Sequence, residues 1–297
     1  TGRMVMMEMA GAQPAAALLL WYAALCAVAV LNPLLLARTR RNHPPSSDPP
    51  RKAYQQKMFL LALPMVFECS YRSVFPSLYL QRYTFWDTPL NSILIDRTFA
   101  CVGEITWTAQ IALALAHVDG EVTGGRAWVR GACALAVLLY VVAEAVSYYN
   151  TATTNELWAA AEVVVDALSW IVLLPASLSL SYGLRHAKWT SAKIFVCVFS
   201  VAALVYPLYN FAIDAPMYLR RYAADQAAGK QYFAFVFGLI DAAIRRVPTR
   251  SLASWEGDMF WMVAYFTFGA WSSILLVCAP TTTPHTQAKD AQLLRVV

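Results

Sequence analysis

The stretch LWAAAEVVVDALSWIVLLPASLSLSY, residues 157–182, decides the class of fold. It is long enough to cross a bilayer, which takes about 20 mostly apolar residues, yet it carries two acids, Glu162 and Asp166. A continuous apolar run of this length is typical of a membrane-spanning helix, whereas strands of membrane β-barrels have about 10 residues of alternating character. The stretch therefore predicts a transmembrane helix with carboxyl groups inside it.

The rest of the chain has the same character. Of its 297 residues, 59% are hydrophobic and 14% are charged, against about 25% charged residues in ordinary soluble domains. Apolar stretches of spanning length recur along it, so we predict an all-α integral membrane protein, a bundle of seven transmembrane helices. The predicted spans are residues 15–37, 58–80, 92–117, 131–149, 157–182, 194–213 and 258–280.

These spans leave only short connections and one longer loop, so we predict a single transmembrane domain over residues 15–280. Residues 1–14 are expected to form a short outer N-terminus, and residues 281–297 a cytoplasmic tail. Within the loop 214–257, the segment QYFAFVFGLIDAAIRR (231–246) is first apolar and then amphipathic. It predicts a helix lying in the membrane interface, with a short re-entrant segment as the alternative.

The orientation follows from the linker between the first two spans. Residues 37–57, ARTRRNHPPSSDPPRKAYQQK, carry six basic residues against one acid, Asp48. Short basic loops stay in the cytoplasm, so we expect the N-terminus outside and the C-terminus inside. A cleaved signal peptide is the alternative interpretation of the first span. The net charge of +5 is explained by such loops, and we expect no nucleic-acid partner.

Charged residues inside the spans are the candidate functional residues. A charge at the bilayer centre costs about 2.5–3.5 kcal/mol, so we expect them to face the bundle interior and to line a polar cavity open to the outside. Two arginines cannot neutralise six acids, so either some carboxyl groups are protonated, or water or a cationic ligand compensates the remaining negative charge. The alternative is that they pair only for packing. The set is Glu68, Arg72, Asp96, Arg97, Glu104, Glu144, Glu162 and Asp166.

Four polar residues in the predicted outer loops are candidates for the cavity mouth. Asp87 and Asn155 belong to short loops at 82–91 and 148–158, while Asp214 and Glu256 border the sixth and seventh spans. Turn formation is the alternative role for residues of these types.

The sequence excludes several functions of membrane helices. The last predicted span, residues 258–280, contains no lysine, so a retinal Schiff base cannot form there. Four histidines, with only His117 near a span, do not supply a haem pair across helices or a di-iron cluster. We expect no metal and no other cofactor.

Three functions remain open. The first is binding or transport of a small polar, cationic or amphipathic ligand, with proton coupling through the intramembrane carboxyls. The second is an enzyme that modifies a lipid, and the third is a non-catalytic subunit of a larger membrane complex. The expected partners are the lipid bilayer and a small molecule or lipid, and assembly into a homo-oligomer or larger complex is left open. We rank ligand binding or transport first, and the pattern does not specify which membrane holds the protein.

Overall fold

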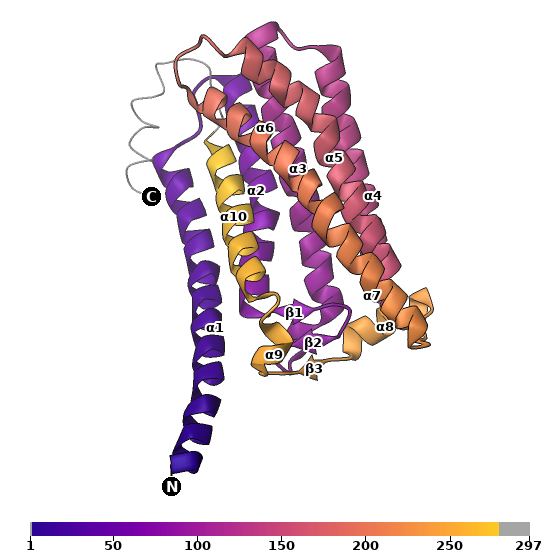
Figure 1. Cartoon of the computed structure of the whole chain (residues 1–297). Coiled ribbons are helices and arrows are strands. Elements are labelled where there is room, and N and C mark those ends of the chain that lie inside the picture. The colour runs from indigo at the N-terminus through magenta and orange to yellow at the C-terminus, as the bar shows by residue number, and fades with distance from the viewer. Residues whose placement is uncertain (1, 279–297) are drawn as a thin grey trace.

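The computed structural model describes residues 2–278, with side chains from residue 16 onward, and is almost entirely helical (Figure 1). The predicted tail, residues 281–297, lies outside the described residues. The helices are α1 (Gly2–Asn42), α2 (Pro49–Val74), α3 (Ile93–Thr123), α4 (Ala127–Thr153), α5 (Glu156–Gly183), α6 (Ser191–Tyr209), α7 (Ala215–Ala227), α8 (Phe235–Ile244), α9 (Leu252–Trp255) and α10 (Met259–Val277).

Six helices in the described part of the chain are long and apolar enough to cross a membrane. They are Ala16–Asn42, Ile93–Thr123, Ala127–Thr153, Glu156–Gly183, Ser191–Ala227 and Met259–Val277. The chain is thus a helical, multi-pass protein of the membrane type. The remaining predicted span corresponds to α2, which is not among the six and contains Glu68 and Arg72. The count of seven spans stays a prediction.

The long helices lie side by side (Figure 1). α2 packs between α1, α3 and α10, and α5 packs against α3, α4, α6 and α7. The links α1–α2, α3–α4 and α5–α6 lie at one end of the bundle, which we call the basic end. α8, α9 and the short strands lie at the other, which we call the hairpin end (Figure 1). α1 begins at the hairpin end, and the predicted outer N-terminal residues 2–14 form its first turns.

The second predicted span, residues 58–80, ends too late. α2 is capped by Asp48, whose side chain accepts a hydrogen bond from the backbone amide of Arg51 at 3.3 Å, and the helix ends at Val74. Pro76 follows, and a proline disfavours helical backbone in the residue before it. Beyond it the chain forms the strands β1 (Ser77–Leu78) and β2 (Tyr83–Thr84), which pair with each other, while β3 (Val247–Pro248) pairs with β2. The segment from β1 to β2 is a hairpin at one end of the bundle.

Two further boundaries differ from prediction. α3 continues to Thr123 and ends where Gly124 adopts a positive φ of 81°, so Asp119 and Glu121, which lie beyond the predicted span 92–117, belong to its last turns. The sixth predicted span also continues: α6 passes through a π-helical turn, Asn210–Asp214, directly into α7. The first part of the predicted loop 214–257 is therefore helical.

Part of the predicted interfacial segment 231–246 is helical, because α8 covers Phe235–Ile244. α8 packs against α3 and α4. Gly238 makes this contact possible, since a Cβ at this position would collide with the carbonyl oxygen of Ala152. Its location in a membrane interface stays a prediction.

Candidate functional site

Arg72 on α2 holds three carboxyl groups. Its guanidinium Nη1 lies 2.7 Å from Oε1 of Glu68, one helical turn earlier on α2. Its Nε lies 3.1 Å from Oδ1 of Asp96, and Nη1 lies 3.7 Å from Oε1 of Glu104, both on α3. Glu68 and Asp96 are buried. Arg72 therefore joins α2 to α3 through charge.

Arg97 on α3 holds a second group of carboxyls. It forms an ion pair with Glu144 on α4 and lies 3.6 Å from Oε2 of Glu104. Its Nη1 lies 3.8 Å from Oε1 of Glu162 on α5. Glu104 thus stands between the two arginines, with one carboxylate oxygen toward each. The predicted interior residues are joined across α2, α3, α4 and α5.

Asp166 on α5 differs from the other acids of this group. Its Oδ2 accepts a hydrogen bond of 2.5 Å from the hydroxyl of Tyr206 on α6. Its Oδ1 is buried and has no hydrogen-bond partner, and no ion pair to Asp166 is found in the described part of the chain. We call the eight charged residues the charged cluster: Glu68, Arg72, Asp96, Arg97, Glu104, Glu144, Glu162 and Asp166.

Tyrosines that the sequence analysis did not single out surround this cluster. The hydroxyl of Tyr265 on α10 donates to Glu104 at 2.6 Å, and that of Tyr140 on α4 donates to it at 3.4 Å. The ring of Tyr79 lies 5.6 Å from the guanidinium carbon of Arg72 and 5.6 Å from that of Arg97. A tyrosine in the middle of a span, instead of at its interfacial end, is the signal that could have identified Tyr140 and Tyr265.

The hairpin reaches the cluster from one end. The hydroxyl of Ser77 donates to Asp96, and Tyr79 stands between the two arginines. Arg82 fixes the hairpin by donating to Asp241 on α8 at 2.8 Å and to the carbonyl of Thr151 on α4 at 2.8 Å. Burial lowers the pKa of Arg82 below its usual value, and the carboxylate of Asp241 opposes that shift. The hairpin therefore covers the cluster at the hairpin end.

The four residues predicted for a cavity mouth have separate surroundings. Asp87 pairs with Arg246 at 3.3 Å, and Asn155 caps α5 by accepting from the amide of Leu157 at 3.0 Å. Asp214 belongs to the π turn, and Glu256 follows α9. No hydrogen bond or ion pair joins these four to one another in the described structure. A shared mouth stays a prediction.

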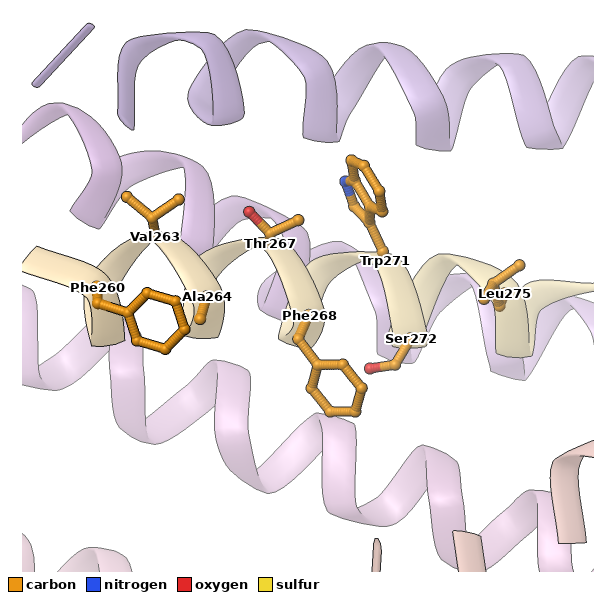
Figure 2. Close-up of a pocket in the computed structure, with 8 residues that line it drawn as sticks. All are labelled: Phe260, Val263, Ala264, Thr267, Phe268, Trp271, Ser272 and Leu275. Atoms are coloured by element: carbon orange, nitrogen blue, oxygen red, sulfur yellow. The ribbon is translucent and has the colours of Figure 1, made fainter. Parts of the chain in front are cut away.

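A pocket lies on the surface of α10 (Figure 2). Phe260, Phe268, Trp271 and Leu275 are among the residues that line it, and Phe268 and Trp271 point to different sides of the helix. No residue of the charged cluster lines this pocket, so the pocket and the charged cluster are separate features.

The described residues contain no group of three or more histidine, cysteine, aspartate or glutamate side chains that could hold a metal ion. The charged cluster contains ion pairs, hydroxyl donors and aromatic rings. No family model, no curated protein and no solved structure matches this chain.

Proposed function

We propose that this multi-pass membrane protein binds a small cationic ligand at the charged cluster and exchanges it with protons. The supporting observation is the charge balance of the cluster. Six carboxyl groups lie with two arginines, and Glu104 is shared between both. Arginine stays protonated in proteins, so its positive charges are fixed and only the carboxyl groups can adjust.

Full ionisation would leave the carboxylates in excess by four charges, six less two. Burying an uncompensated carboxylate costs several kcal/mol even after relaxation. The excess must therefore be removed by protons on the carboxyl groups or by a bound cation. These two alternatives compete for the same oxygens, so binding of a cation expels protons and protonation expels the cation.

Two carboxyl groups of the charged cluster are partly exposed, which favours exchange of a ligand and of protons with the surroundings. The side chain of Glu162 is 23% exposed and that of Glu104 is 14% exposed, while Glu68 is fully buried. We propose that the ligand enters from the hairpin end, which the basic linker at the opposite end assigns to the outside. Movement of the ligand across the membrane would make the protein a transporter, and retention would make it a binding protein.

Mass spectrometry of small molecules that co-purify with the detergent-solubilised protein tests this function. We expect a cationic species with the wild type that is lost in Glu104→Gln. Glu121→Gln, on the same helix but 29% exposed and paired with His117, is the matched control and keeps the species. Identical profiles from equally folded wild type and Glu104→Gln would contradict the proposal and favour a structural subunit.

A further inference from the structure

We infer that the ligand is an organic ammonium ion whose charged head binds Asp166 against the rings of Tyr206 and Trp170. The inference rests on the proposed function and names the class of ligand for the same cluster. Asp166 is the one acid of the charged cluster that neither Arg72 nor Arg97 holds.

Asp166 has an oxygen available for a ligand. The residue is 7% exposed, its Oδ2 accepts from Tyr206, and its Oδ1 accepts no hydrogen bond, although the side chain of Trp170 also interacts with the carboxyl group. A buried acceptor without a donor costs about 1–3 kcal/mol, more if it is charged. An ammonium N–H directed at Oδ1 would supply both the missing donor and the missing positive charge. The other acids of the cluster have an arginine within ion-pair distance.

Aromatic rings pack together beside Asp166. Trp170 lies one helical turn further along α5, and its ring centroid is 5.0 Å from that of Tyr206 and 5.4 Å from that of Phe199. The ring centroid of Trp107 lies 5.9 Å from that of Trp170. The faces of such rings attract cations, and quaternary or alkylated ammonium groups are held in this way.

The same surroundings are unsuitable for an inorganic cation. Calcium takes six to eight oxygen ligands and magnesium keeps an octahedral shell of oxygens, whereas Asp166 offers one carboxylate next to one tyrosine hydroxyl and several rings. An organic ammonium ion has an apolar body that the rings can contact. A nearby buried donor, the indole Nε1 of Trp107, is without a partner and suits an oxygen elsewhere on the ligand.

The helix that carries Tyr206 is irregular next to this position. Pro207 follows directly, and the π turn Asn210–Asp214 begins within the next helical turn. π turns inside helices are frequent at functional sites. The side-chain amide of Asn210 donates to the backbone carbonyl of Val163 on α5 at 3.3 Å, so the π turn is joined to the helix of Asp166.

The test is calorimetric titration of the full-length protein in detergent at about pH 8 with 2-phenylethylammonium. Its neutral isostere 2-phenylethanol and the chlorides of sodium, potassium and calcium are titrated in parallel. We expect saturable binding of the ammonium ion with proton release, and no binding of the alcohol. Asp166→Asn and Trp170→Leu should each weaken binding by about tenfold or more, the effect of losing one charge-assisted or cation–π contact.

Controls separate the inference from the proposed function. Asp225→Asn, which removes a carboxylate paired with Lys230 on α7, should bind as the wild type does. Should Asp166→Asn fail to fold, Trp170→Leu decides the assignment, since it keeps the carboxylate. Wild-type affinity in a folded Asp166→Asn or Trp170→Leu variant would overturn the inference. Proton release caused only by an inorganic cation would overturn it and leave the proposed function standing, whereas no proton release with any cation would overturn both.

Discussion

The bundle buries carboxyl groups near both ends, and the two groups are compensated differently. Near the basic end, Asp119 stands with one arginine, Arg126. Its oxygens accept from the amide of Arg126 at 2.6 Å, from Nε of Arg126 at 2.7 Å and from the hydroxyl of Thr123 at 2.9 Å. One acid is matched by one base, and both oxygens have donors. This pair closes the turn between α3 and α4.

The charged cluster toward the hairpin end lacks this balance. Its acids outnumber its arginines by three to one, and Asp166 keeps a buried oxygen without a donor. The residues also come from four helices, so no single turn requires them. The comparison teaches that burial of a carboxylate is not by itself a functional signal. The informative property is whether the surrounding bases and donors account for it.

Removal of one arginine should break the cluster. Arg97→Met leaves Glu144 and Glu162 without their ion-pair partner, and breaking a buried pair in this way costs about 3–5 kcal/mol. Unfolding of the purified variant in detergent measures the loss. Arg130→Met is the control, because Arg130 is exposed. Equal stability of Arg97→Met and wild type would show that the acids do not depend on Arg97.

Removal of the charge on Asp119, which is paired with Arg126, should have a smaller effect on stability and no effect on ligand binding. Asp119→Asn loses the charge opposite Arg126, whose side chain is 27% exposed and can turn to water. We expect a loss of about 1–3 kcal/mol, as for a buried hydrogen-bonded group. Ligand binding of the folded variant, measured by calorimetry, should equal that of the wild type. Weakened binding would mean that the two sites are coupled.

Neutralising one acid of the cluster should have the smallest effect on stability but abolish binding. Glu104→Gln reduces an excess of negative charge and keeps a side chain that can accept from Tyr265. We expect the free energy of unfolding to change by less than about 1 kcal/mol, with loss of the co-purifying cation. A Glu104→Gln variant that unfolds would instead indicate that the cluster is structural.

The end of the bundle that faces the outside can be identified with substitutions that leave stability unchanged. Ser46→Cys lies in the basic link, and Glu256→Cys lies at the hairpin end. In intact cells an impermeant thiol reagent should label the second position and not the first. Labelling of Ser46→Cys alone would reverse the orientation, and the charged cluster would then face the cytoplasm.

Residue spacing predicts the local part of the site. Glu68 and Arg72 are four residues apart in the sequence, a spacing that places them on one face of a helix, and they form an ion pair. The contacts between helices depend on how each helix is rotated, which an apolar pattern with few charges does not determine. Tyr265 shows this limit, because α10 between Met259 and Val277 has no charged residue to mark its inner face.

Helix positions followed from apolar runs, but helix ends did not. Pro76 interrupts a long apolar pattern that the prediction continued to residue 80, whereas Pro216 lies inside a helix that the prediction ended at residue 213. A proline has no amide hydrogen to give to the preceding turn, so it usually ends or kinks a helix. At Pro216 a π turn lies directly before it and the helix continues, and composition carries no sign of that turn.

The π turn between α6 and α7 determines which face of α7 is turned toward the bundle. A π turn closes over one residue more than an α turn, and one residue corresponds to about 100° of rotation about a helix axis. If Asn210–Asp214 instead wound as a regular α-helix with no residue removed, all of α7 would rotate by about 100° against α5. Loss of a single codon within these five residues would remove the extra residue of the π turn, so the same face of α7 would stay toward the bundle.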